Sequence, residues 1–197
     1  MDEIKFYVVD VETTGLQCGH HEVTQISIIR CSDRNQLNKY IKAEFPDRAQ
    51  DRALKITGRT REDILNGESR KDVVEACNKF FEEDGGSPEG RCIVGHNIQR
   101  FDRRFLHELW ESVGKEFPAF LWLDTLPSTK AFAVKKGIVS PTFNLEASLN
   151  LTGTKHRRKN LHNAVVDTQN TYMLWKKLDE EGVDMLEYTE RVPHRLE

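Results

Sequence analysis

An apolar run that ends in acidic residues constrains the fold of this chain more than any other feature of its sequence. Residues 8–16 read Val-Val-Asp-Val-Glu-Thr-Thr-Gly-Leu, and the residues from Ile4 to Val11 are mostly β-branched or aromatic. This composition predicts a β-strand buried on both faces. Asp10 and Glu12 come at its end and are two positions apart, so their side chains project from the same face.

Two carboxylates held side by side repel each other, and both stay ionised only if a cation lies between them. Oxygen ligands on a rigid strand suit a hard divalent ion such as Mg²⁺ or Mn²⁺. The alternative is a solvated strand end whose acids bind nothing. Asp10 and Glu12 alone leave both interpretations open.

Length and composition narrow the class of protein. The 197 residues fit one domain, residues 1–197, that is long enough to bury a substantial core. The formal net charge of -3 and the pI near 6.2 show no global basicity, so a nucleic acid must be bound by a local patch or by metal ions. The four cysteines lack CxxC spacing, which argues against zinc and favours a reducing compartment.

The sequence also lacks targeting and membrane signals. No charged-then-apolar leader precedes the first predicted strand, and no apolar run approaches the ~18 residues of a membrane span. We therefore expect a cytoplasmic protein, or a nuclear one if its source has a nucleus, with no membrane partner.

Hydrophobic periodicity predicts an α/β fold with one mixed sheet flanked by helices. Three successive strands, the third half exposed and reaching Phe45, form an antiparallel meander, and helices and strands alternate after it. Expected strands lie over 4–11, 23–31, 37–45, 92–94 and 119–123. Expected helices lie over 53–58, 61–65, about 70–84, 101–113, 125–136, 144–151 and 162–181, with Ser69 as a cap and Gly58 and Gly67 as stops.

Two predicted helices carry an acid on the side that should face the core. Asp102 shares a face with Phe105, Leu106 and Leu109, and Asp167 falls on the packed side of the last helix. A buried carboxylate without a partner costs several kcal/mol, so each needs a compensating cation. An ion pair with Arg or Lys explains one such acid. Two of them, together with Asp10 and Glu12, favour a shared Mg²⁺ or Mn²⁺ site over zinc.

One histidine suits proton transfer at such a site. His162 lies five residues before Asp167, about 140° away on a continuous helix, so we expect it in the turn that enters the helix. An imidazole titrates near pH 6.5 and can accept a proton from an attacking water. A surface or capping role is the alternative. His96 competes for the same role, but its position just after a buried strand favours a structural one.

Three segments resemble the exonuclease motifs of the DEDDh branch of the DnaQ-like 3′-5′ exonucleases. They are residues 10–16, the segment from Gly95 to Asp102, and residues 162–167 with the form H-x-A-x-x-D. Residues 56–58 and 124–126 also resemble segments between those motifs, so the likeness covers nearly the whole chain. Between Asn97 and Asp102 the chain has one residue more than the proofreading subunit of bacterial DNA polymerase III. That spacing is similar to the three-prime repair exonucleases, whose proline-rich insertion is absent.

The resemblance implies an RNase H-like fold and two-metal hydrolysis of nucleic acid from its 3′ end. It makes Asp10, Glu12, Asp102 and Asp167 the ligands of two divalent ions, Mg²⁺ or Mn²⁺, and His162 the general base. Residues that match the family's substrate contacts are Thr13, Thr14, Gly15, Leu16 and Asn97.

The function expected from this resemblance is removal of nucleotides from the 3′ end of single-stranded or frayed DNA, in repair or proofreading. The first alternative is an exoribonuclease that trims RNA ends or short oligoribonucleotides. The second is a catalytically silent binding module. Such a module would lack one of the four carboxylates or the histidine, and all five residues are present. A polymerase partner is compatible with either enzyme, and the sequence does not identify one.

Three further features keep two interpretations each. The basic run from Lys155 to Lys159 contacts an entering nucleic-acid backbone or is a solvated loop. The same choice holds for Arg100, Arg103 and Arg104. Asp124 supports the acidic site from behind or caps the helix that follows it, and is left out of the site.

Overall fold

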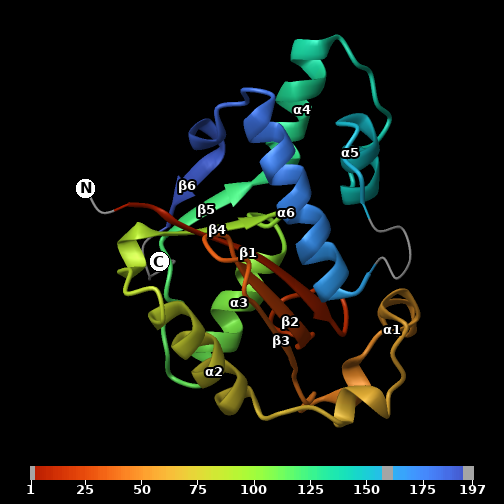
Figure 1. Cartoon of the computed structure of the whole chain (residues 1–197). Helices are drawn as coiled ribbons and strands as arrows, with labels where there is room; N and C mark the ends of the chain where they lie inside the picture. Colours follow the sequence, from red (N-terminus) through yellow and green to blue (C-terminus); the bar gives the residue numbers. More distant parts are fainter. Residues whose placement is uncertain (1–2, 157–161, 193–197) are drawn as a thin grey trace.

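The computed structural model describes residues 3–156 and 162–192, and its centre is a mixed sheet (Figure 1). The strand order is β3-β2-β1-β4-β5-β6. β1, β4 and β5 run parallel to one another, and β2, β3 and β6 are antiparallel to their neighbours. The strands are β1 Lys5–Thr13, β2 Val23–Arg30, β3 Gln36–Tyr40, β4 Arg91–Gly95, β5 Leu121–Asp124 and β6 Thr189–Arg191. The predicted fold class, with its antiparallel meander and parallel strands, is confirmed.

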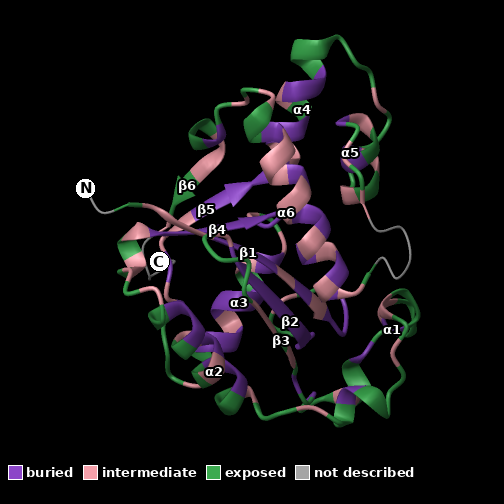
Figure 2. Ribbon diagram, viewed as in Figure 1, coloured by how far each residue is buried: buried purple, intermediate pink, exposed green. Residues whose placement is uncertain are grey.

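Helices cover both faces of the sheet, so that the strands are largely buried (Figure 2). One core joins the sheet to α2 and α3, and the other joins it to α4, α5 and α6. The α-helices are α1 Asp51–Thr57, α2 Arg70–Glu82, α3 Asp102–Glu111, α4 Thr125–Lys136, α5 Leu145–Leu151 and α6 Ala164–Glu180. Among the described residues, no helix is both long and apolar enough to cross a membrane.

Alternation along β1 assigns its side chains to these two cores. Tyr7, Val9 and Val11 pack on the side of α2 and α3, and Val8 packs on the side of α6. Asp10 and Glu12 continue the series of Val8 beyond the last apolar contact. The acids therefore face the end of the sheet where α6 begins.

Local sequence signals explain most helix ends. The Ser69 side chain accepts a hydrogen bond from the amide of Asp72 at 3.1 Å, as the predicted cap requires. Asn163 caps α6 in the same way through the amide of Val165 at 3.1 Å. Gly58 ends α1 with a φ of +67°, a left-handed conformation that costs glycine little.

Some predicted boundaries were wrong. The third strand ends at Tyr40, short of Phe45, because Ile41 bridges to Glu68 instead. Gly67 ends no helix: a Cβ there would lie 2.4 Å from the Lys42 nitrogen, so the glycine permits a close approach of two backbones. The strand β6 was not predicted.

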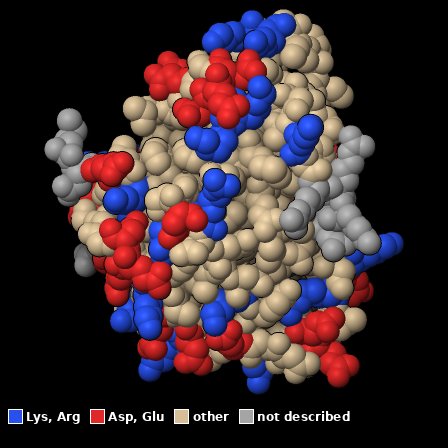
Figure 3. All heavy atoms as spheres, viewed as in Figure 1, with Lys and Arg blue, Asp and Glu red and all other residues tan. Residues whose placement is uncertain are grey.

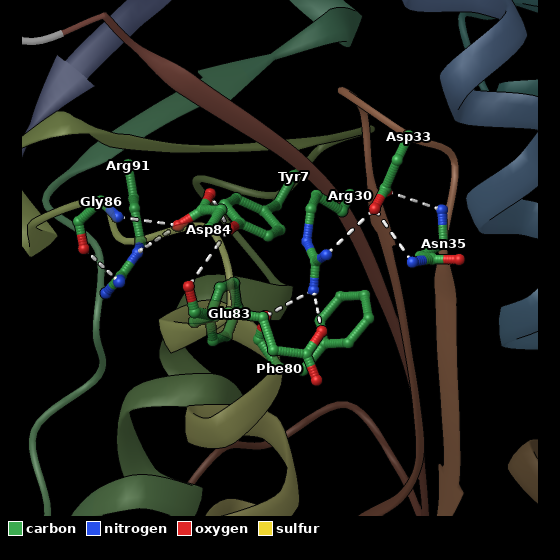
Figure 4. A network of polar contacts seen from close by, with 10 residues as sticks. Tyr7, Arg30, Asp33, Asn35, Phe80, Glu83, Asp84, Gly86 and Arg91 are labelled. Atoms are coloured by element: carbon green, nitrogen blue, oxygen red, sulfur yellow. Dashed lines mark hydrogen bonds and ion pairs between the residues drawn. The ribbon is translucent and has the colours of Figure 1, made fainter.

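A polar network braces the end of the sheet opposite the acids (Figure 4). The hydroxyl of Tyr7 donates to Asp84, and Arg91 lies 4.0 Å from the same carboxylate. Arg30 donates to the carbonyl of Phe80 at 2.9 Å. These bonds tie β1, β2 and β4 to the end of α2. The position of β1 is thus fixed at its start, while its far end carries the acids.

Candidate active site

Three carboxylates from opposite ends of the chain meet at the end of β1. One oxygen each from Asp10, Glu12 and Asp167 can be chosen so that all three lie within 4.8 Å of one another. Asp10 and Glu12 come from one face of β1, and Asp167 comes from the first turn of α6. Oδ1 of Asp167 is buried and has no hydrogen-bond partner. An unpaired buried carboxylate oxygen beside two other carboxylates fits a cation ligand.

Asp102 lies outside this group of three but next to it. Its side chain is 6% exposed, and its Oδ1 accepts a hydrogen bond from the amide of Val11 at 3.3 Å. β4 lies beside β1, and their pairing ends at Val8 and Val94. The chain leaves β4 near the acidic end of β1, and Asp102, the first residue of α3, contacts β1 there. This hydrogen bond holds Asp102 next to Val11, the residue between Asp10 and Glu12 on β1.

Burial raises the pKa of all four acids, and repulsion by neighbouring acids adds to it at Asp10 and Glu12. The pKa of Asp10 is raised well above its usual range by burial, and then by the charges of Asp102, Glu12 and Asp167. Burial and the charges of Asp167 and Asp102 raise the pKa of Glu12 to about 8. Burial raises the pKa of Asp102 to about 7 and also raises that of Asp167.

The alternative explanation for inward acids, an ion pair with Lys or Arg, does not hold here. Among the described residues, no ion pair joins any of the four to a basic side chain. Arg59 comes nearest to this role, because its charge partly lowers the pKa of Glu12. Within residues 3–156 and 162–192, the cluster therefore has no ion pair that compensates its charge, and it suits divalent metal ions.

His162 stands at the rim of the acids, as its predicted place before the helix requires. Its φ is +66°, and α6 begins two residues later. Its backbone amide donates to Oδ2 of Asp167 at 2.9 Å. The side chain lines a hollow of about 170 Å³ together with Asp10 and Asp167. An imidazole in this position can exchange a proton with a water in the hollow.

His96 lines the same hollow, but both of its ring nitrogens already have partners. Nδ1 lies 2.9 Å from the hydroxyl of Thr125, and Nε2 lies 2.8 Å from the carbonyl oxygen of Phe143. Burial lowers its pKa. These bonds tie β4 to α4 and to the start of α5, which is the structural role expected for His96.

The turn after Glu12 is held by its own hydroxyls. Thr13 donates to the carbonyl of Gly15 at 2.7 Å, and the hydroxyl of Thr14 accepts from the amide of Glu22 at 2.9 Å. A Cβ on Gly15 would lie 2.3 Å from the ring of His21, so the turn packs against that ring. Leu16 is 77% exposed. Leu16 is therefore the side chain of this turn that is open to a ligand.

Asn97 and Asp124 form a brace behind the acids. The amide of Asn97, which has a φ of +64°, donates to Asp124 Oδ1 at 2.8 Å. The same oxygen accepts from the amide of Leu126 at 2.9 Å and so caps α4. Asp124 thus caps α4 and also holds the segment that leads to Asp102, so the two roles considered for it are compatible.

The basic residues differ in their availability. Arg103 is paired with Glu190 at 2.6 Å, whereas Arg100 and Arg104 are exposed. Of the basic run, Lys155 is described, and residues 157–159 lie outside the described residues. Lys, Arg, Asp and Glu are interspersed over the face in Figure 3, in keeping with the absence of global basicity. Arg59, beside Glu12, was missed by sequence reasoning, although it directly follows the family-like segment 56–58.

Sequence comparison identifies a family. The RNase_T exonuclease family model matches residues 7–175. Relatives include the PolC-type DNA polymerase III of Listeria monocytogenes, 26% identical over 186 residues, which cover 89% of this chain and 11% of that protein. The enzyme of the same name from Thermotoga petrophila is 34% identical over 106 residues, 53% of this chain and 7% of its own length. The chain thus spans about a tenth of these relatives.

Solved structures share the fold. Exonuclease I of E. coli in complex with a dT13 oligonucleotide has a TM-score of 0.72 and 22% identity, covering 90% of this chain and 41% of that one. The cell-death related nuclease CRN-4 has a TM-score of 0.72 and 16% identity, covering 91% and 65%. Both have the RNase H-like arrangement of mixed sheet and flanking helices.

Proposed function

The chain belongs to the RNase_T exonuclease family, and we propose that it removes nucleotides one at a time from the 3′ end of single-stranded or frayed DNA. The observation that carries this proposal is the acid cluster, with oxygens of Asp10, Glu12 and Asp167 within 4.8 Å and Asp102 fixed beside them. Four carboxylates that cannot all ionise without cations are suited to holding two divalent metals next to a phosphodiester.

The metal ligands in this proposal are Asp10, Glu12, Asp102 and Asp167, and the ions are Mg²⁺ or Mn²⁺. Oxygen-only ligands favour these hard ions. When bound, the ions supply charge stabilisation for the attacking and leaving oxygens. Oδ1 of Asp167, buried and unpaired, supports its assignment as a ligand.

His162 is the general base. It takes a proton from the water whose oxygen forms the new bond to phosphorus, while the bond from phosphorus to the 3′ oxygen of the penultimate nucleotide breaks and that oxygen takes up a proton from solvent. The products are a nucleoside 5′-monophosphate and a strand one residue shorter. The hollow that His162 shares with Asp10 and Asp167 provides room for that water.

The turn formed by Thr13, Thr14, Gly15 and Leu16 holds the terminal nucleotide. Because both hydroxyls serve the turn itself, contact with substrate falls to its backbone and to the exposed side chain of Leu16. Asn97 completes this set by fixing the segment that leads to Asp102. The exposed Arg100 and Arg104, next to Asp102, are available for phosphates.

The wider setting is part of the proposal. The chain acts as one exonuclease domain, and its likeness to segments of PolC-type DNA polymerase III supports work alongside a polymerase. The four free cysteines support a cytoplasmic location, or a nuclear one in a eukaryote.

A ladder assay tests the proposed function. DNA and RNA oligonucleotides of one sequence, labelled at the 5′ end, are incubated with the protein and Mg²⁺ or Mn²⁺. We expect stepwise shortening of the DNA, loss of activity in EDTA, and recovery when metal is restored. Faster shortening of RNA would replace DNA by RNA as substrate. Intact substrates under all conditions would refute the enzyme activity.

A further inference from the structure

A row of side chains leads across the sheet from the acids to its edge. Glu12 of β1 is paired with Gln25 of β2, and Gln25 is paired with Tyr40 of β3. Directly paired residues project from the same face of a sheet, so all three side chains share the face covered by α6. Two strand spacings separate Tyr40 from Glu12, about 10 Å. Tyr40, on the edge strand β3, is 40% exposed.

A hollow of about 370 Å³ opens beside this row. Asn163, the residue after His162, forms one side of it, and Thr57 at the end of α1 lies on another. Its lining consists of Gln25, Tyr40, Thr57, Gly58, Arg59, Asp63, Asn66 and Asn163. The hollow therefore borders the proposed active site but shares none of its acids.

The guanidinium group of Arg59 lies over the ring of Tyr40 in this hollow. The guanidinium carbon of Arg59 lies 4.9 Å from the centre of the Tyr40 ring. Arg59 donates to the carbonyl of Thr24 at 2.9 Å and to that of Asp63 at 2.7 Å. These bonds use two of its five donors and fix the side chain before any ligand arrives. A fixed planar cation loses little rotamer freedom when it binds.

We propose that Tyr40 and Arg59 bind a nucleobase of the substrate strand upstream of its terminal nucleotide, an inference that rests on the proposed function. Aromatic rings and arginine planes are the surfaces on which unpaired bases stack, and such stacking tolerates any base. The distance from Glu12 matches an upstream base of a strand whose end lies at the acids. The stack thus provides grip on single-stranded substrate without sequence selection.

An abasic scan tests this binding site. Oligonucleotides of equal length carry one abasic position that is moved along the last nucleotides of the strand, and initial rates are measured with wild-type protein, Tyr40→Leu and Tyr40→Phe. With intact substrate we expect Tyr40→Leu to raise KM about tenfold and to leave kcat within about twofold. Tyr40→Phe keeps the ring and should behave as wild type.

The position of the missing base provides the second readout. For wild type, one upstream abasic position should raise KM about as much as Tyr40→Leu does, and that position should have no further effect in Tyr40→Leu. Phe45→Leu is the matched control, because Phe45 is similarly exposed and stacks on Arg48 at 3.9 Å but does not line the hollow. Its KM and abasic profile should equal those of wild type.

The outcomes separate the two proposals. If wild-type protein cleaves the intact oligonucleotide but Tyr40→Leu has an unchanged KM, the base-binding site is refuted while the exonuclease function stands. The base-binding site is also refuted if Tyr40→Leu keeps the wild-type abasic profile, or if Phe45→Leu raises KM equally. If wild-type protein cleaves no oligonucleotide, the proposed function itself fails. Thermal unfolding of each variant verifies that the folds are equivalent.

Discussion

Replacing Glu12 with Gln should stabilise the metal-free protein while it abolishes activity. Burial and the charges of Asp167 and Asp102 raise the pKa of the Glu12 carboxyl from 4.5 to about 8, and the charge of Arg59 offsets this only in part. Glutamine has nearly the same shape but carries no charge. The substitution therefore removes a destabilising charge and leaves the packing of β1 unchanged.

The size of the effect depends on pH. Below pH 4.5 Glu12 is protonated in the folded and the unfolded chain, so its charge contributes nothing. As the pH rises from 4.5 to about 8, the unfolded chain loses a proton that the folded protein keeps, and stability falls. The difference between these pKa values corresponds to about 5 kcal/mol. Because four acids share the repulsion, we expect removal of one charge to recover about 2 kcal/mol at pH 8.

Urea unfolding in EDTA at pH 5 and pH 8 measures the free energy of unfolding of the variant and of wild type. Glu12→Gln should exceed wild type by about 2 kcal/mol at pH 8, or roughly 4–8 °C in melting temperature, and by much less at pH 5. Added Mg²⁺ should stabilise wild type more than the variant. Glu146→Gln is the control, since Glu146 lines the hollow beside Asp10 and Asp167 but is exposed. Equal or lower stability of Glu12→Gln at pH 8 would show that the charge of Glu12 does not destabilise the folded protein.

Three further substitutions test other parts of the argument. Asp102→Asn should retain the fold but lower kcat with Mg²⁺ by more than about 100-fold. A loss of roughly 10–100-fold is typical of a residue that only supports a metal ligand, and single-turnover assays at saturating metal distinguish the two. His162→Asn should lower kcat about 10²–10⁴-fold in single-turnover assays, so an unchanged kcat in the folded variant excludes the base role. Ser69→Ala, at the cap of α2, should cost about 1 kcal/mol in urea unfolding with kcat/KM unchanged, and a lower kcat/KM in fully folded variant would link α2 to the site.

Elements with strong local signals could be predicted from the sequence. The segment around β1 is apolar at nearly every position because both faces are buried, and Ser69 marks the start of α2 through its own side chain. β6 could not be found in this way. Its three residues, Thr189 to Arg191, are half-buried or exposed, and they form a strand only because β5 offers a free edge.

The same distinction applies to the site. Asp102 and Asp167 could be predicted as site residues because each interrupts the apolar stripe of its own helix. The Arg59–Tyr40 stack had no such signal. Tyr40 is brought into line with Glu12 by the register of three strands, and Arg59 is fixed by carbonyls of Thr24 and Asp63. Contacts of this kind depend on pairing between segments that sequence periodicity does not specify.

The position of Asp102 shows which force decides the charge of the site. It lies in the first turn of α3, where a helix favours negative charge by up to about 2 kcal/mol, and it accepts a bond from the amide of Val11. Its pKa nevertheless rises from 3.8 to about 7, a net cost of about 4 kcal/mol for the ionised form. Burial beside other acids therefore outweighs the stabilisation that the backbone provides. The backbone groups around Asp102 therefore do not offset the cost of its charge, and divalent cations bound at the acids would lower that cost.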